Sequence, residues 1–182
     1  MKPIVKEIND EWIKKEVPCQ SALDWWDRKV TDPVKILKLL IKAKKYDWAN
    51  WFIVRVMTYY DYVSYAVYAE EQVIKIYEKD YPDDKRPRLA IESARKCIDD
   101  PSEENKQAAA RAAEAAWAAA RAAEAAGAAE AAGAAEAAWA EAWASAEAAG
   151  AAARAAWAAG AATQLKILKY GMKLLTTLRG VK

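Results

Sequence analysis

The chain contains no histidine, and this absence narrows its chemistry more than any other feature of the composition. Histidine is the commonest general base in enzymes and the commonest metal ligand among side chains. The two cysteines, Cys19 and Cys97, are far apart in sequence and lack metal-site spacing, so we expect thiols rather than a disulfide. No glycine-rich phosphate loop follows a strand pattern. The sequence therefore predicts a protein that is not an enzyme and that uses no cofactor or metal.

A strong charge of either sign is also missing, because the 182 residues carry a formal net charge of only +2. An extended nucleic acid is therefore not an expected partner. The N-terminus is charged throughout, and we expect no secretory signal. One long stretch is rich in alanine, but glutamate and arginine recur in it too often for a membrane span. We expect a protein of the bacterial host cytoplasm with no membrane partner.

Glycine and proline are scarce, with six of each, and their positions favour helices over strands. Thr31-Asp32-Pro33 is a typical helix start, with proline at the first helical position. Asn9 can cap a short helix that ends before Pro18. By the same signals we predict helices over residues 10–16, 22–30, 34–41, 47–56, from 58 or 61 to about 79, 88–98 and 165–178, and one starting at 102.

The stretch over residues 107–162 is almost wholly alanine, interrupted every three or four residues by a larger residue or a glycine. Alanine has the highest helix propensity, and glutamate and arginine follow closely. Between residues 121 and 139 the interrupting residues have a constant spacing of three. Since an α-helix has 3.6 residues per turn, these positions do not stay on one face and are distributed around the whole helix. Two glycines fall inside that run. We predict a helix break or hairpin near 127–133 and a second near 150.

These patterns predict an all-α protein, with about six helices up to residue 100 and two or three alanine-rich helices after it. Residues 1–100 would form a helical N-terminal domain, packed against alanine-rich helical hairpins in residues 101–182. Alanine faces let helix backbones approach closely, so we expect alanine in the seams. An apolar stripe should dock the last helix on the N-terminal helices. Its members are Leu165, Leu168, Met172, Leu175 and Leu178.

Aromatic residues also recur at helical spacing in the N-terminal half. For Trp48, Trp51 and the tyrosine series, this spacing is more typical of a core than of a binding site. Arg55 lies between these aromatic residues, and we expect it to pair with Asp61 or Glu70. Paired carboxylates occur along the chain, but adjacent residues do not face each other on a helix. A carboxylate-based hydrolase with a bound divalent ion is the enzyme alternative.

The candidate binding residues lie in the alanine-rich stretch, where tryptophan and arginine recur at helical spacing. Trp117 and Arg121, for example, are i,i+4 neighbours. Tryptophan stacks on a base, and arginine holds phosphate with a bidentate fork. Hairpins would bring these residues into one cleft for a nucleotide-like anion; packing against the N-terminal half or a second subunit is the alternative. The predicted ligand-binding residues are Arg111, Trp117, Arg121, Trp139, Trp143, Arg154 and Trp157.

The segments DWANWFIVRVM and YAEEQVIKIYEKDYPDDKRPRLAIESARKCIDD precede the alanine-rich stretch. This order resembles a family of alanine-rich helical proteins from phage and bacteria, some known as immunity proteins and others only as phage proteins. Its most specific part is Tyr81, Pro82, Asp83, Asp84, Arg86, Pro87 and Arg88. The relatives often carry Tyr, Asp or His in the alanine-rich part, where this chain has Trp, Glu, Arg and Gly. The resemblance implies no enzyme activity and suggests a role in conflict between phage, host and toxin.

Two functions fit these observations. In the first, a phage-type counter-defence protein sequesters a small nucleotide-like signal, which the alternation of arginine and tryptophan favours. In the second, an immunity-type protein binds and masks a toxin or another protein. The near-neutral charge argues against an inhibitor of a nuclease toxin, which is usually acidic. We expect the first function, and we expect a homo-oligomer, most simply a dimer, because exposed tryptophans favour association.

Overall fold

The structure is a computed structural model that describes residues 5–125 and 161–178. The described residues form eight α-helices and no strand, which confirms the predicted all-α class. Six of the helices precede residue 100, also as predicted. The helices are α1 (Asp10–Glu16), α2 (Gln20–Trp25), α3 (Pro33–Lys42), α4 (Tyr46–Val56), α5 (Tyr59–Asp80), α6 (Arg86–Asp99), α7 (Glu103–Ala125) and α10 (Ala161–Leu178).

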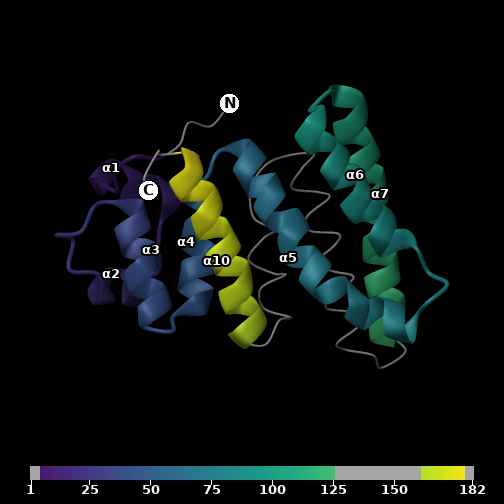
Figure 1. Cartoon of the computed structure of the whole chain (residues 1–182), viewed down its shortest axis with the longest axis horizontal. Helices are drawn as coiled ribbons and strands as arrows, with labels where there is room; N and C mark the ends of the chain where they lie inside the picture. The colour runs from purple at the N-terminus through teal and green to yellow at the C-terminus, as the bar shows by residue number, and fades with distance from the viewer. Residues whose placement is uncertain (1–4, 126–160, 179–182) are drawn as a thin grey trace.

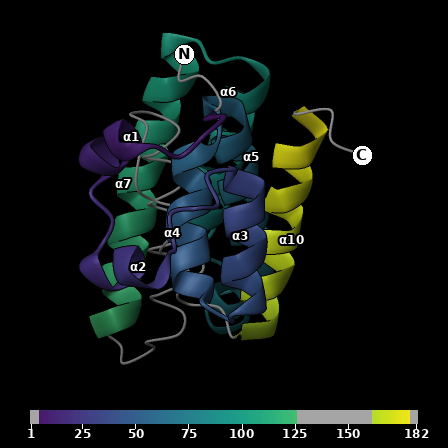
Figure 2. The same cartoon turned by 90° about the vertical axis from the view of Figure 1, so that its left-hand side faces the viewer.

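The helices form two groups joined by the long helix α5. Figure 1 shows α1–α4 at one end of the molecule, α6 and α7 at the other, and α10 beside α4 and α5. In Figure 2, α10 and α7 lie on opposite sides of the group that α3, α4 and α5 form. None of the described helices combines the length and the apolar character that crossing a membrane requires.

Side-chain caps place the starts of α1, α3 and α5 where the sequence predicts them. Asn9 accepts a hydrogen bond from the Trp12 amide at 2.9 Å, and Asp32 accepts one from the Lys35 amide at 2.8 Å. Thr58 begins α5 in the same way. Such caps satisfy the amides that the first turn of a helix leaves without partners. These starts are local in origin, and the sequence is sufficient to locate them.

The second helix is shorter than the predicted 22–30, because α2 ends at Trp25. Trp26 has an extended backbone, and Arg28 has a positive φ of 60° that ends any regular helix. Two hydrogen bonds hold the loop that follows: the Asp27 carboxylate accepts from the Lys29 amide, and the Trp26 indole donates to the Val30 carbonyl at 2.8 Å. The apolar periodicity of residues 23–30 is thus helical only up to Trp25, and its remainder belongs to a loop.

The turn between α5 and α6 contains the most specific motif of the sequence. The Asp84 carboxylate accepts a hydrogen bond from the Tyr77 hydroxyl at 2.7 Å and two or more from the Arg86 guanidinium. The hydrogen bonds from Arg86 hold the pKa of the Asp84 carboxyl well below its usual range. A second pair joins Arg88 of α6 to Glu78 of α5 at 2.6 Å. The motif is therefore a clamp that fixes the angle between two helices.

The described part of the alanine-rich stretch packs as expected, with alanine in the seam. Helix α7 lies along α6, and its completely buried residues are Ala109, Ala113, Ala116 and Ala119. Helix α6 contributes the small buried residues Ala90 and Ala94. We call the contact between these two faces the alanine seam. The hairpins predicted near 127–133 and 150 lie outside the described residues.

The last helix docks on the N-terminal helices through the predicted stripe. Leu168 and Leu175 are completely buried, and α10 contacts α3, α4 and α5. Gly171 allows the closest approach, since a Cβ atom there would lie 2.5 Å from side-chain atoms of both Ile53 and Tyr65. Tyr170 stacks on Tyr68 of α5 with the ring centroids 4.0 Å apart. Helix α10 therefore holds the α4–α5 pair from one side.

Candidate functional site

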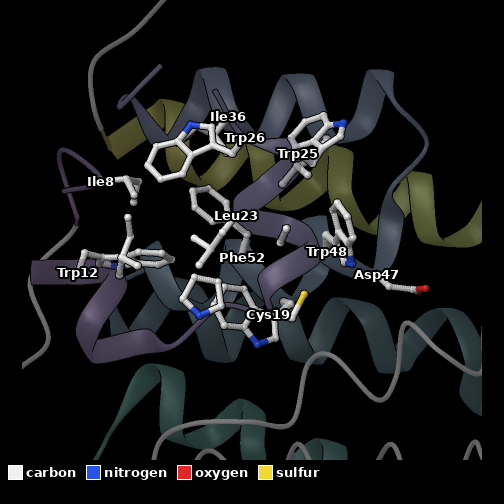
Figure 3. Close-up of a pocket in the computed structure, with 15 residues that line it drawn as sticks. Ile8, Trp12, Cys19, Leu23, Trp25, Trp26, Ile36, Asp47, Trp48 and Phe52 are labelled. Atoms are coloured by element: carbon white, nitrogen blue, oxygen red, sulfur yellow. The ribbon is translucent and has the colours of Figure 1, made fainter. Parts of the chain in front are cut away.

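A pocket of about 400 Å³ lies among the N-terminal helices (Figure 3). Its walls come from α1, α2, α3 and α4, from the segments that precede α1 and α2, and from Trp26, which directly follows α2. Five of the nine tryptophans of the chain line it, and we call it the tryptophan pocket. The lining residues are Ile8, Trp12, Ile13, Pro18, Cys19, Ala22, Leu23, Trp25, Trp26, Ile36, Leu40, Asp47, Trp48, Trp51 and Phe52.

Local sequence explains how each wall reaches the pocket. In α4, Trp48, Trp51 and Phe52 are three and four residues apart, so they share one face of the helix. Helix α1 ends at Glu16. The next residue, Val17, has a positive φ of 47°, and Pro18 follows it. A proline cannot continue the helix, so the chain turns there and α2 begins as a separate short helix. The pocket is the space between α1 and α2 on one side and α3 and α4 on the other.

The tryptophan rings meet edge to face rather than in parallel stacks. The Trp12 ring lies 6.1 Å from the Trp51 ring at an angle of 87°, and 5.6 Å from the Phe52 ring. The Trp25 and Trp48 rings are 6.2 Å apart at an angle of 67°. Edge-to-face contact is a preferred arrangement of aromatic pairs. Large rigid rings in this arrangement leave space between them, which explains a cavity inside an otherwise apolar cluster.

Two cations lie against the tryptophan rings without being part of the pocket lining. The Lys45 ammonium is 3.9 Å from the Trp48 ring centroid and 5.9 Å from that of Trp25. The Arg55 guanidinium is 3.9 Å from the Trp51 ring centroid. All three distances fall within the range of cation–π attraction, which extends to about 6 Å from the ring centroid. Each of these rings thus has a cation on one face.

Arg55 has a different partner from the one predicted. It forms an ion pair with Glu16 of α1 at 3.5 Å and donates to the Trp51 carbonyl at 2.8 Å. The expected pairing with Asp61 or Glu70 is wrong, because the close packing of α1 against α4 brings Glu16 nearer. Burial lowers the pKa of the Arg55 guanidinium, and the Glu16 carboxylate opposes this shift. The pair links α1 to the wall that carries Trp51.

The pocket lining offers little charge. Of the described residues that line it, Asp47 alone has a formal charge, and Figure 3 shows this carboxylate at one edge, turned away from the rings. Cys19 is exposed at another edge, and neither it nor Cys97 forms a disulfide. The Trp12 indole N–H is buried and has no hydrogen-bond acceptor among the described residues. This arrangement suits the burial of a flat, weakly polar group rather than acid–base chemistry.

The structure describes the side chains of two of the predicted site residues, and both belong to α7. Arg111 is exposed on α7, and Trp117 is 45% exposed on the same helix. The two are six residues apart, which separates them by about 120° around the helix axis. Arg121 belongs to α7 as well. The other four residues, Trp139, Trp143, Arg154 and Trp157, lie outside the described residues, so the predicted site stays a prediction.

Sequence reasoning missed the tryptophan pocket, although one signal for it exists. Trp48 and Trp51 do pack against the core, as expected, but they also line the cavity. The signal is the density of tryptophan, since four of the nine stand within residues 25–51 around two short helices.

A buried carboxyl group in α5 is the second unusual feature. Glu70 is completely buried, and among the described residues neither of its carboxylate oxygens has a hydrogen-bond partner. Its neighbours on the same face of α5 are apolar, including Ala66, Val67 and Val73. Burial raises the pKa of the Glu70 carboxyl well above its usual range. Burial thus favours the neutral, protonated form of this carboxyl group more than in an exposed glutamate.

No protein-family model, curated protein or solved structure matches this chain. The resemblance to immunity-type proteins of phage and bacteria therefore stays a prediction from the sequence. Any account of function rests on the residues themselves.

Proposed function

We propose that this chain is a non-catalytic binding protein that sequesters a small ligand, with the planar part of the ligand in the tryptophan pocket. The observation that carries the proposal is a cavity of about 400 Å³ with five tryptophans in its wall. Pockets for small molecules measure about 300–1,000 Å³ and have mostly apolar and aromatic linings. Stacking of a base on an aromatic side chain contributes about 1–3 kcal/mol.

The proposed ligand is a nucleotide-like signal, and the proposed setting is a phage-type counter-defence protein in the host cytoplasm. The support comes from the sequence, through the alternation of arginine and tryptophan in residues 107–162 and through the family resemblance. The pocket lining contains no arginine or lysine among the described residues. A nucleotide would therefore place its base in the pocket and keep its anionic part outside.

A thermal-shift screen of the full chain against cyclic nucleotides and ADP-ribose derivatives tests this function. A ligand present at 100 times its Kd stabilises a protein by about 2.7 kcal/mol, so a true ligand gives a clear shift. Arg121→Ala and Trp143→Ala should reduce the shift if the alanine-rich stretch holds the anionic part. No shift with any nucleotide, together with a stable complex with a protein partner, would favour an immunity-type function instead.

The proposal includes a homo-oligomer. Trp117 on α7 and Leu89 on α6 are 45% and 53% exposed, and large exposed apolar side chains favour association. Light scattering at micromolar concentration should give at least twice the mass of one chain. The mass of a single chain would count against this part of the proposal.

A further inference from the structure

Two of the tryptophan rings that line the pocket, those of Trp48 and Trp51, each have a cation against one face. One face of Trp48 is 3.9 Å from the Lys45 ammonium, and one face of Trp51 is 3.9 Å from the Arg55 guanidinium. Neither cation lines the pocket, so the pocket receives other parts of these rings. Both rings therefore already make a cation–π contact with a side chain of the protein itself.

A cation on one face of an indole ring changes the attraction at the other face. Cation–π attraction comes from the negative quadrupole of the ring, and a bound cation draws that electron density toward itself. The remaining face attracts a second cation less, whereas it still stacks well on a neutral, electron-rich ring. The Lys45 and Arg55 contacts thus argue against a positively charged ligand.

A negatively charged group is not suited to the pocket either. Asp47 is the one charged residue among the described lining residues, and its sign repels an anion. Arg55 is already bound to Glu16 and to the Trp51 carbonyl. Moving an anion into an apolar cavity without a paired cation is strongly unfavourable. The phosphate of a nucleotide would stay in solvent or meet another part of the chain.

The size of the pocket and its aromatic lining point to a flat aromatic ring system. Its volume of about 400 Å³ lies near the lower end of ligand-pocket volumes, which suits a group of one or two rings. Tryptophan and phenylalanine rings form much of its wall, and such rings stack on flat aromatic groups. Nucleobases are flat heteroaromatic groups that stack on aromatic side chains in this way, with about 1–3 kcal/mol per base.

We infer that the tryptophan pocket selects a neutral two-ring heteroaromatic group, of the kind found in a purine base, and excludes the charged parts of its ligand. This inference rests on the proposed function, because it assigns one part of the sequestered ligand to one site. It also goes further, since it separates the ring-binding site from the residues predicted to hold an anion.

Calorimetric titration of the full chain with three related compounds tests the charge preference. Adenosine is neutral, 1-methyladenosine carries a positive charge on its ring, and AMP adds a phosphate outside the ring. We expect adenosine to bind at least tenfold more tightly than 1-methyladenosine, and AMP to bind at least as tightly as adenosine. Indole is titrated as a fourth compound. Its affinity, compared with that of adenosine, shows whether the pocket prefers an indole-type ring to a nucleobase. Tighter binding of the ring cation would overturn the inference.

A cavity-filling variant locates the binding. Ala22 lines the pocket, and Ala22→Phe should fill part of it and weaken adenosine and AMP by at least tenfold. Ala162→Phe makes the same change at an exposed position of α10 and should leave both affinities unchanged. Circular dichroism checks that each variant keeps its helices, and Ala22→Leu replaces Ala22→Phe if the larger residue prevents folding.

The outcomes separate this inference from the function on which it rests. If AMP binds and the Ala22 variants bind it equally well, nucleotide sequestration stands and the assignment of the pocket is wrong. If adenosine binds in the pocket and AMP does not, the ring-binding site stands and the nucleotide is not the ligand. If neither adenosine, AMP nor indole binds, both proposals are overturned.

Discussion

The alanine seam and the tryptophan pocket bury apolar surface in opposite ways. In the seam, small side chains such as Ala113 and Ala116 are completely buried between two long helices. In the pocket, five large rings from short helices meet edge to face and leave about 400 Å³ between them. Small residues of one shape fill a seam with few gaps, whereas rigid rings at irregular angles do not. Space for a ligand therefore arises at the tryptophans of the N-terminal half.

The comparison predicts that an added side chain is far more harmful in the seam than in the pocket. Ala113→Leu should lower the free energy of unfolding by about 3 kcal/mol, the upper end of the cost of overpacking a core. The position is completely buried, and α6 is the described helix along which α7 packs. Urea denaturation measures the loss. A loss below about 0.5 kcal/mol, typical of surface positions, would mean that the seam is not tightly packed.

Helix α5 joins the two regions. Unlike the alanine seam and the tryptophan pocket, its buried face contains an ionisable side chain, that of Glu70. Replacing this buried carboxyl with an apolar residue, in Glu70→Leu, should stabilise the protein by about 2 kcal/mol, because a buried polar group without a partner is unfavourable. Chemical denaturation at pH 7 measures the gain. A substantial loss of stability would show that the carboxyl has a partner outside the described residues.

The same group predicts how stability depends on pH. The native state raises the pKa of Glu70, so it binds the proton more tightly than the unfolded chain does. Its contribution is therefore fully present below the unfolded pKa of about 4.3 and decreases as pH rises toward the native value. Glu70→Gln should remove this decrease. Glu71→Gln is the matched control, because Glu71 is paired with Arg95 near the surface and should alter stability by less than about 1 kcal/mol.

The clamp at the start of α6 orients the helix that forms one side of the seam. Asp84→Asn should cost about 1 kcal/mol, because hydrogen bonds to a charged group are lost at a partly exposed site. The native state lowers the Asp84 pKa, so the contribution is present above the unfolded pKa of about 3.9 and disappears as pH falls. The stability curves of the two proteins should stay a constant distance apart from pH 7 to about pH 4 and should begin to approach each other below that pH. Curves that stay parallel below that pH as well would show that the clamp contributes little.

The smallest effect is expected in the pocket itself. Ala22→Leu adds a side chain of the same kind as Ala113→Leu, but it extends into existing space. We expect a change in stability of about 0.5 kcal/mol or less. A loss as large as that of Ala113→Leu would remove the contrast between the two regions.

Helix starts could be predicted from the sequence because their causes are local. Asn9, Asp32 and Thr58 each accept a hydrogen bond from an amide in the following turn, and residue type and spacing reveal this directly. The docking of α10 was also predictable, since its apolar stripe needs a partner surface. The end of α2 was not predictable, because the positive φ of Arg28 and the bond from Trp26 to Val30 depend on the loop that follows.

The pocket could not be predicted because it depends on how separate helices meet. Trp48 has the helical spacing of a core residue, and no local pattern shows that Trp25 lies 6.2 Å away at a steep angle. The partner of Arg55 was missed for the same reason, since Glu16 reaches it only through the packing of α1 on α4. The contacts that define the candidate site are all tertiary.

A nitrogen–proton correlation spectrum of the nine tryptophan indoles, recorded with and without adenosine, tests the central claim most directly. Single Trp→Phe variants assign the signals. We predict that the indole signals of Trp25, Trp48 and Trp51 shift on binding and that the signal of Trp117, which lies outside the pocket, does not. Shifts confined to Trp117, Trp139, Trp143 and Trp157 would contradict the account and place the ligand in the alanine-rich stretch.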